Sequence, residues 1–210
     1  MNKKGILVVV SGFAGSGKGT VMKELLSRYD NYSLSISATT RTPRPGETNG
    51  KEYFFKSRDE FEEMIDRGEF IEFAKYVNNY YGTPQKYVKE QLDLGKDVIL
   101  EIEIQGALQI KSKYPDTLLL FLTPPDVDTL KKRLVDRGTE DIDTIHARLR
   151  RACEEVEFVD KYDYILVNME IDECVSKVHS IIQNEHHRTF RNSEFLEDIR
   201  KEFELFAKGE

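Results

Sequence analysis

The sequence predicts an α/β fold in which helices cover both faces of a parallel β-sheet. Short apolar runs rich in Val, Ile and Leu recur along the chain, and a helix-like segment follows most of them. The runs are continuous rather than alternating, which is typical of strands buried on both faces of a parallel sheet. At 210 residues the chain is long enough for one such core and a small inserted lobe.

Strands and helices are predicted in alternation along the chain. Strands are expected at 6–10, 33–37, 98–102, 118–122 and 164–167, and helices at 18–29, 105–113, 126–136 and 172–186. Parallel sheets of this kind bind ligands beyond the carboxyl ends of their strands. The loop 12–17, Ser37, the segment Glu101–Glu103 and Asn168 all fall at those ends, so we expect the functional site there.

Three segments depart from this alternation. Residues 38–92 contain prolines, glycines and only short apolar pieces, which predicts an inserted lobe with helices at 59–67 and 85–94. Residues 137–157 are dense in Arg and Glu, which is typical of a mobile helical lid. The core then comprises 1–37, 93–136 and 158–210. In the last stretch, 188–210, apolar residues near helical spacing favour a helix packed on the body over a partner-binding tail.

Composition limits the classes of function. Charged residues make up 33% of the chain and hydrophobic residues 39%, as in soluble globular proteins. The formal net charge of −7 argues against a broad nucleic-acid surface. No apolar stretch approaches the roughly 20 residues that span a bilayer, and the N-terminus lacks the features of a signal peptide. Cys153 and Cys174 have no metal-ligand spacing. We therefore expect a cytoplasmic protein with reduced thiols and with neither nucleic-acid nor membrane partners, as a monomer or a homo-oligomer.

The most informative motif is the loop Gly12-Phe13-Ala14-Gly15-Ser16-Gly17-Lys18-Gly19-Thr20 between a strand and a helix. That context is the one a phosphate-binding loop of the Walker A type requires. Its glycines let backbone N–H groups and the positive end of the helix face one anion. Lys18 can then reach the outer phosphates of a nucleoside triphosphate. A plain glycine-rich turn into a helix is the alternative.

The second motif is the segment 39–53, which two prolines hold extended. In an extended chain Arg41 and Arg44 lie roughly 10 Å apart at Cα, so that both guanidinium groups can converge on one phosphate. Tyr53 and Tyr81 can add hydroxyl donors to the same anion. Two surface arginines in a proline-rich loop are the alternative.

Three glutamates are also candidates for chemistry. Glu101 and Glu103 are two residues apart on a predicted strand, so they project to one face, where they suit Mg²⁺. Ion pairing at a strand end is the alternative. Glu72 lies in an alternating stretch, and that pattern by itself points its side chain at water.

Taken together, these motifs resemble the guanylate kinase family. The glycine loop, the segment 39–53, Tyr80-Tyr81-Gly82-Thr83 and Glu101-Ile102-Glu103-Ile104-Gln105-Gly106 occur in the family's order and at its intervals, over about residues 5–185. The resemblance implies a P-loop nucleoside monophosphate kinase with a GMP-binding lobe and a lid. It also implies transfer of the γ-phosphoryl group of ATP to GMP, giving ADP and GDP.

The resemblance implies roles for individual residues as well. Residues implied to bind ATP are Gly12, Phe13, Ala14, Gly15, Ser16, Gly17, Lys18, Gly19, Thr20, Arg133, Arg137 and Asn168. Residues implied to bind GMP are Ser37, Arg41, Arg44, Tyr53, Glu72, Tyr81, Thr83 and Glu103. Residues implied to be catalytic are Lys18, Arg41, Arg137 and Arg148, with Arg151 as a further candidate. A solvated helix salt bridge is the alternative for each arginine after residue 132.

Glu72 is implied to accept from guanine N1–H and the 2-amino group together. Adenine has no such donor pair, so a carboxylate there selects guanine. Mg²⁺ is expected as cofactor, held mainly by phosphates and water, with Thr20 and Glu101 as further candidate ligands.

The sequence departs from the family pattern at three places. Gly19 stands where a strict Walker A loop has the Ser or Thr that binds Mg²⁺. Phe13-Ala14 replaces the commoner Pro-Ser, and Glu103 stands where Asp is usual. Two other functions are alternatives: a kinase of another small phosphate acceptor, and a non-catalytic phosphopeptide-binding module related to guanylate kinase. Such a module would need neither Lys18 nor the lid arginines.

Overall fold

The computed structural model describes residues 4–76, 78–136 and 142–209. Five strands form one sheet in the order β2-β7-β1-β8-β9, and every neighbouring pair is parallel. The strands are β1 (Leu7–Gly12), β2 (Tyr32–Leu34), β7 (Asp97–Glu101), β8 (Leu118–Thr123) and β9 (Tyr164–Val167). The prediction of a parallel sheet is confirmed. One predicted strand, 33–37, is shorter, because β2 ends at Leu34.

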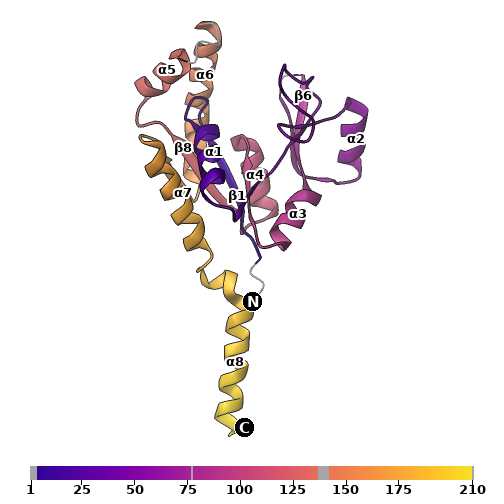
Figure 1. The fold of residues 1–210 in the computed structure, drawn as a ribbon, viewed down its shortest axis with the longest axis vertical. Helices are drawn as coiled ribbons and strands as arrows, with labels where there is room; N and C mark the ends of the chain where they lie inside the picture. Colours follow the sequence, from indigo (N-terminus) through magenta and orange to yellow (C-terminus); the bar gives the residue numbers. More distant parts are fainter. Residues whose placement is uncertain (1–3, 77, 137–141, 210) are drawn as a thin grey trace.

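Helices cover both faces of this sheet (Figure 1). On one face α1 (Lys18–Arg28) and α7 (Ile171–Glu185) pack on strand residues that include Val8 and Val10. On the other face α3 (Gln85–Asp93) and α4 (Ile104–Lys113) pack against Val9 and its neighbours. Successive residues of β1 therefore enter opposite cores, which explains its continuous apolar sequence.

A second, smaller sheet has its own core. Its strands β4, β3, β6 and β5 lie in that order. Their bounds are β3 (Ala38–Thr39), β4 (Phe54–Phe55), β5 (Phe70–Tyr76) and β6 (Asn79–Pro84). Helix α2 (Arg58–Asp66) contributes Phe61, which is buried and stacks on Phe70 with ring centroids 4.4 Å apart. Residues 85–92, assigned to the lobe from sequence, form most of α3 and pack with the core sheet instead.

Two helices stand above the glycine loop, of which the first was predicted as part of the core and the second as the lid. Helix α5 (Val127–Asp136) and α6 (Ile142–Glu155) share a small apolar cluster, and the 3₁₀ helix η1 (Val156–Lys161) follows. Residues 137–141 between them, including Arg137, lie outside the described residues. Among the helices that the structure describes, none is both long enough and apolar enough to cross a bilayer.

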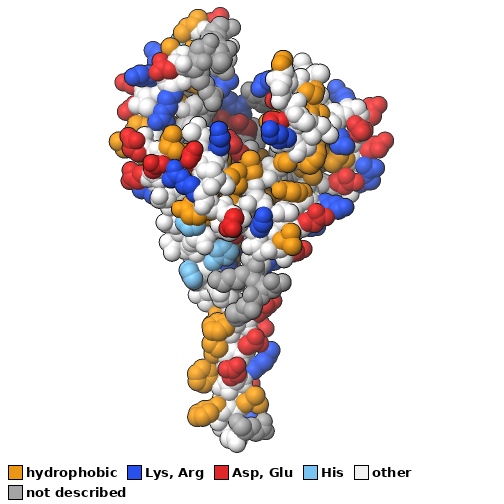
Figure 2. All heavy atoms as spheres, viewed as in Figure 1, with side chains coloured by type: hydrophobic (Ala, Val, Ile, Leu, Met, Phe, Trp, Pro, Cys, Tyr) orange, Lys and Arg blue, Asp and Glu red, His pale blue; other side chains and the backbone are white. Residues whose placement is uncertain are grey.

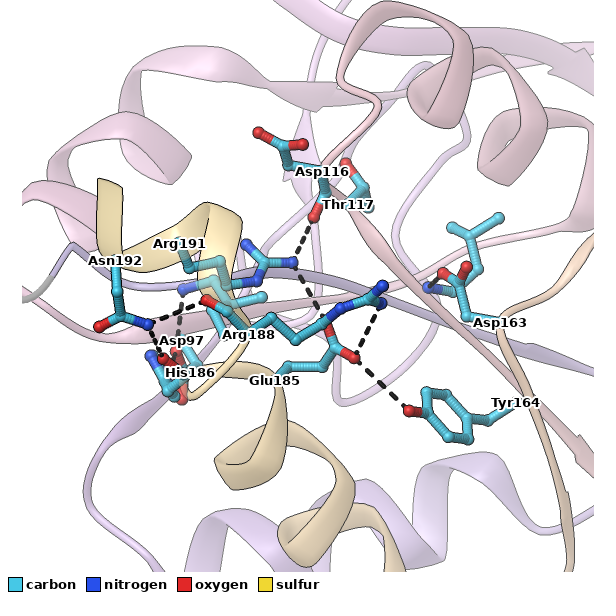
Figure 3. A network of polar contacts seen from close by, with 12 residues as sticks. Asp97, Asp116, Thr117, Asp163, Tyr164, Glu185, His186, Arg188, Arg191 and Asn192 are labelled. Atoms are coloured by element: carbon cyan, nitrogen blue, oxygen red, sulfur yellow. Dashed lines mark hydrogen bonds and ion pairs between the residues drawn. The ribbon is translucent and has the colours of Figure 1, made fainter. Parts of the chain in front are cut away.

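The C-terminal segment differs from the prediction. After η2 (Thr189–Asn192), helix α8 (Ser193–Lys208) points away from the body, and none of its residues is buried (Figure 1). The prediction that this helix packs on the body is therefore wrong. Before α8 begins, a network of polar contacts ties the end of α7 and η2 to the body (Figure 3).

That network begins at Asp97, whose side chain is almost fully buried. Its carboxylate accepts the backbone N–H of Ile6 at 2.8 Å and lies 2.9 Å from Nε2 of His186. Glu185, also buried, lies 3.4 Å from Nη1 of Arg188 and 3.5 Å from Nη2 of Arg191. Residues far apart in sequence are thus joined at the amino ends of the strands.

Replacing Asp97 with alanine should lower the free energy of unfolding by about 2–4 kcal/mol, because its buried donors lose their acceptor. Urea unfolding followed by circular dichroism measures this loss. The control is Asp93→Ala, which removes an exposed ion pair with Lys4 at 3.8 Å and should change stability little. Equal stability of the two variants would contradict the assignment of Asp97 as an anchor.

Candidate active site

Three cavities adjoin one another at the carboxyl ends of the core strands. The loop cavity, about 670 Å³, is lined by residues that include Gly15, Gly17 and Arg133. The central cavity, about 410 Å³, shares Gly15 and Gly17 with it. The lobe cavity, about 280 Å³, shares Ser37, Tyr53, Glu101, Ile102 and Glu103 with the central one. The central and lobe cavities therefore form one groove between the core sheet and the small sheet, and the loop cavity extends it past Gly15 and Gly17 to the space beside α1 and the start of α7.

The glycine loop has a backbone that side chains would disrupt. Gly17, with φ of 91°, caps α1, and a Cβ there would lie 2.5 Å from Nδ2 of Asn168. A Cβ on Gly12 would lie 2.1 Å from the backbone oxygen of Leu122. These glycines allow the loop to pass close to β8 and to the segment after β9.

Arg133 and Asn168 hold this loop from outside. Nδ2 of Asn168 donates to the backbone oxygen of Ser16 at 2.8 Å, and Nη1 of Arg133 donates to the same oxygen at 3.3 Å. Nη2 of Arg133 also donates to the backbone oxygen of Asn168 at 2.9 Å. Both side chains line the loop cavity, as does Thr20. The structure therefore brings these predicted site residues together with the loop.

Lys18 opens α1 and lines the central cavity. Its ammonium group folds back on the loop, where it donates to the backbone oxygens of Gly12 and, at 3.3 Å, of Phe13. Glu101 lines the same cavity at the end of β7. Partial desolvation raises the pKa of Glu101, and the positive charge of Lys18 opposes that rise. A cation and a carboxylate thus face the space in front of the loop.

Glu72 lines the lobe cavity and is only 5% exposed to solvent. A β-bulge between Phe70 and Glu72 shifts the pairing of β5 with β6, so that Glu72 faces inward and Phe73 outward. The hydroxyl of Thr83 donates to Oε1 of Glu72 at 2.7 Å. Burial raises the pKa of Glu72, and the contacts with Thr83 oppose that rise. The alternating pattern that points Glu72 at water does not hold.

One lining residue of the lobe cavity, Gly106, had no predicted role. A Cβ on Gly106 would lie only 3.0 Å from Oε2 of Glu72, so glycine lets α4 approach the carboxylate. Gly106 belongs to the sequence motif Glu101–Gly106, but only the folded structure shows that this glycine makes room for the carboxylate of Glu72. Gln105 and Lys75, which also line the cavity, stand in no pattern that could have identified them.

The predicted phosphate-binding residues of the lobe are only partly assembled. The guanidinium of Arg41 lies 5.4 Å from the ring centre of Tyr53, and the rings of Tyr53 and Tyr81 are 6.0 Å apart. Arg41 also pairs with Glu47 at 2.8 Å, and this contact holds the pKa of Glu47 below its usual value. Arg44 is exposed and does not line these three cavities.

Helix α6 brings two arginines to the groove. Arg148 lines the central cavity. Arg151 lies 2.8 Å from Glu155 on its own helix and 3.3 Å from Glu103, so it joins the lid region to the lobe cavity. Desolvation raises the pKa of Glu155, and Arg151 opposes that rise. Arg137 lies outside the described residues.

The unusual pair Phe13-Ala14 now has a structural reason. Both side chains pack on the apolar cluster that Leu130, Leu134 and Ile145 form between α5 and α6. The ring of Phe13 also meets Phe121 edge to face, with centroids 5.0 Å apart. The loop is therefore in apolar contact with the helices above it, and Phe13 adds an aromatic contact that proline cannot make.

Comparisons with known proteins agree with this geometry. The sequence model of the family described as guanylate kinase matches residues 4–185. A protein named guanylate kinase from Lactococcus lactis subsp. lactis is 51% identical over 191 residues, covering 91% of this chain and 93% of that protein. One of the same name from Streptococcus thermophilus is 52% identical over 192 residues, covering 91% and 92%.

A solved structure agrees as well. The crystal structure of guanylate kinase from Anaplasma phagocytophilum superposes with a TM-score of 0.74 at 32% sequence identity, and the match covers 90% of both chains. The α/β fold predicted from sequence is confirmed, and so is the resemblance of the motifs. The chain belongs to the guanylate kinase family.

Proposed function

We propose that this protein transfers the γ-phosphoryl group of ATP to GMP, giving ADP and GDP. The observation that carries this proposal is the continuous groove, with the glycine loop and Lys18 at one end and the Glu72–Thr83 pair at the other. Two ligands can meet there head to head in a space that both ends share. The names of the relatives support the same assignment.

The loop cavity is the ATP end of the groove. Backbone amides of residues 12–20 bind the phosphates, and the α1 dipole adds to their attraction. Arg133 and Asn168 keep the loop in place through the backbone oxygen of Ser16. Lys18 leaves its loop carbonyls and contacts the outer phosphates when ATP is bound.

The lobe cavity is the GMP end. The ionised carboxylate of Glu72 accepts from guanine N1–H and the 2-amino group, while Thr83 holds its other side in place. Tyr53, Tyr81 and Arg41 bind the 5′-phosphate, with Arg41 exchanging Glu47 for the phosphate. Ser37, Arg44 and Glu103 complete the proposed GMP set, and Arg44 must turn inward to reach it.

The central cavity is where the phosphoryl group moves. Phosphoryl transfer requires positioning and neutralisation of charge rather than a strong base, because the acceptor phosphate carries the attacking oxygen. Lys18 and Arg148 line this cavity, and Arg137 and Arg151 are proposed to add charge when the lid region closes. Closure also excludes water that would otherwise hydrolyse ATP.

Mg²⁺ is the proposed cofactor, and it would supply positive charge that offsets the charge of the phosphates. Glu101, facing the central cavity, fits such an ion, and the hydroxyl of Thr20 at the loop cavity is a second candidate ligand. Within the described ranges there is no group of three or more His, Cys, Asp or Glu side chains that could hold a metal. We propose that phosphates and water would supply most of the ligands of the ion.

The test is ADP release coupled to ATP and a panel of acceptors: GMP, AMP, UMP and a ribose phosphate. We expect turnover with GMP and much slower turnover with the others. Equal use of AMP would favour a kinase of another acceptor. A folded protein that binds phosphopeptides but releases no ADP would favour the binding module. We also propose that the enzyme works in the cytoplasm, in purine nucleotide metabolism and GTP supply.

The pH dependence of kcat/KM for GMP provides a second prediction. Because burial raises the pKa of Glu72, this carboxylate takes up a proton at a higher pH than an ordinary glutamate. A protonated carboxyl cannot accept both guanine donors, so kcat/KM should fall as the pH decreases through the pKa of Glu72. Glu72→Gln lacks this titration and is the control, since the second ionisation of the phosphate near pH 6 affects both proteins. Identical profiles would contradict the role of Glu72.

A further inference from the structure

Lys113, the last residue of α4, reaches the strand that carries Glu72. Its Nζ donates to the backbone oxygen of Ile71 at 3.1 Å. Lys and Arg side chains lie across the visible face of the body, so a lysine at the surface is ordinary (Figure 2). Lys113 differs from these surface lysines in its acceptor, because the carbonyl of Ile71 belongs to the bulge of β5.

The bulge decides where Glu72 faces. From Phe70 to Glu72 the pairing advances by two residues on β5 but by one on β6, so Ile71 is the extra residue. The side chain of Ile71 enters the core between the main sheet and α4, where it packs in one cluster with Ala107 and Ile110. The next side chain, Glu72, lines the lobe cavity. A bulge re-aims side chains in this way, so a contact that holds the carbonyl of Ile71 helps to fix the direction of the carboxylate.

Helix α4 also approaches Glu72 near its first turn. A Cβ on Gly106 would lie 3.0 Å from Oε2 of Glu72. Gly106 and Lys113 are about two helical turns apart, so they lie on the same side of α4. The helix therefore supports Glu72 at two points, directly at its carboxylate and through Ile71 at its backbone.

The charge of Lys113 acts on the same carboxylate. Burial raises the pKa of Glu72, while its contacts with Thr83 and the positive charge of Lys113 oppose that rise. Lys113 does not line the lobe cavity, so a nucleotide bound there would leave it in place. The charged groups that do line this cavity are Lys75 of β5, Glu101 at the end of β7, Glu103 before α4 and Arg151 of α6.

We propose that Lys113 is a positioning residue for GMP, which holds the bulge of β5 and keeps the carboxylate of Glu72 ionised and aimed at the guanine base. This inference rests on the proposed function, in which that carboxylate selects guanine. Lys113 itself touches neither nucleotide. Its hydrogen bond to Ile71 restrains the strand, and its positive charge favours the form of Glu72 that has two acceptor oxygens.

The first test is the kinetics of Lys113→Met, which removes the ammonium group and keeps an unbranched apolar side chain. KM for GMP should rise about 10-fold while kcat stays within about twofold, because the base is bound equally before and during phosphoryl transfer. The acid limb of kcat/KM for GMP should move to higher pH, since loss of the positive charge lets the pKa of Glu72 rise further. Lys113→Arg keeps both charge and donor and should restore KM to within about twofold of the parent.

Lys111→Met is the matched control. Lys111 lies two residues earlier in α4, donates to the backbone oxygen of Thr117 at 2.6 Å and pairs with Asp163 at 3.0 Å. Both lysines are in the last turn of the helix, so this variant removes the same charge from the same helix terminus. It should lower the free energy of unfolding but leave KM and the acid limb unchanged. Glu101, whose pKa is also raised by desolvation, titrates alike in all of these proteins.

An NMR titration of the free protein separates this inference from the proposed function. In protein labelled at the side-chain carboxyl carbon of glutamate, the signal of Glu72 is the one that Glu72→Gln removes. Its midpoint should move to higher pH in Lys113→Met, but keep the parent value in Lys111→Met and in Lys113→Arg. This result is expected whether or not GMP is the acceptor, because it needs no turnover.

The outcomes are distinct. The inference is overturned by an unchanged midpoint in Lys113→Met, by an unchanged KM in a protein that does phosphorylate GMP, or by Lys111→Met producing the same changes. A shifted midpoint in a protein that does not phosphorylate GMP would confirm that Lys113 acts on Glu72 and would remove the proposed function instead.

Discussion

Replacing Lys18 with alanine is expected to lower turnover by about 1,000-fold or more, with little change in the free energy of unfolding. The ammonium group donates to the loop carbonyls of Gly12 and Phe13, at the edge of the central cavity. Water in the cavity can replace it as the donor to these carbonyls, so the cost to folding is small. What disappears is the positive charge that would meet the phosphoryl group during transfer.

The measurement is coupled ADP release at saturating ATP and GMP, together with urea unfolding of the same protein. Lys23→Ala is the matched control, because Lys23 lies on the same helix, is exposed and does not line the groove. It should keep normal turnover. Near-normal turnover of Lys18→Ala would contradict the mechanism, and so would a large loss of stability, since that would make Lys18 a structural residue.

Replacing Glu72 with glutamine is expected to lower kcat/KM for GMP by about 100- to 1,000-fold. The side chain keeps its size, and its oxygen can still accept from Thr83. Its amide nitrogen, however, presents hydrogen atoms where guanine also has donors. Two donors that face each other in a buried site lower binding affinity far more than the loss of one apolar contact does. Preference for GMP over AMP should decline by the same factor.

The free energy of unfolding of Glu72→Gln should not fall, although its kcat/KM does. A raised pKa means that the folded protein holds the proton of Glu72 more tightly than the unfolded chain does. The contribution of Glu72 to stability is therefore greatest below its unfolded pKa and is lost as the pH rises through the folded pKa. Glutamine avoids this loss, so Glu72→Gln should be at least as stable as the parent at pH 7.

The control for Glu72 is Glu69→Gln, a half-buried residue that pairs with Arg67 at 2.7 Å one residue before β5. Kinetics with GMP and AMP should be those of the parent. If Glu72→Gln keeps its preference for GMP, the carboxylate does not select guanine, and the groove needs another assignment.

The positions of the site residues could be predicted to different degrees. The glycine loop follows directly from its flanking strand and helix, since three adjacent elements determine its geometry. Glu72 did not follow from its pattern, because a bulge in β5 reverses the direction that alternation gives. Arg41 and Tyr53 were expected to act together, and the guanidinium of Arg41 does lie over the ring of Tyr53. The ion pair between Arg41 and Glu47 could not be predicted from residue spacing.

Helix α8 shows the same division. Its helical spacing was readable, and the helix exists over Ser193–Lys208. The helix was wrongly expected to pack on the body. Amphipathic spacing indicates that one face of a helix packs against something, but it does not identify the partner. Just before α8, Arg191 bonds the backbone oxygen of Asp116 and pairs with Glu185, and these three residues meet only in the folded core.

By itself the sequence determined the parallel sheet, the glycine loop at its carboxyl edge and the family. These follow from contiguous residues, since burial on both faces requires continuous apolar runs and a phosphate loop requires glycine at set positions. Only the tertiary structure decided where Glu72 points, how Arg133 and Asn168 hold the loop and where α8 projects. Each of these rests on a contact between distant residues, and the energy of such a contact exists only once the chain has folded.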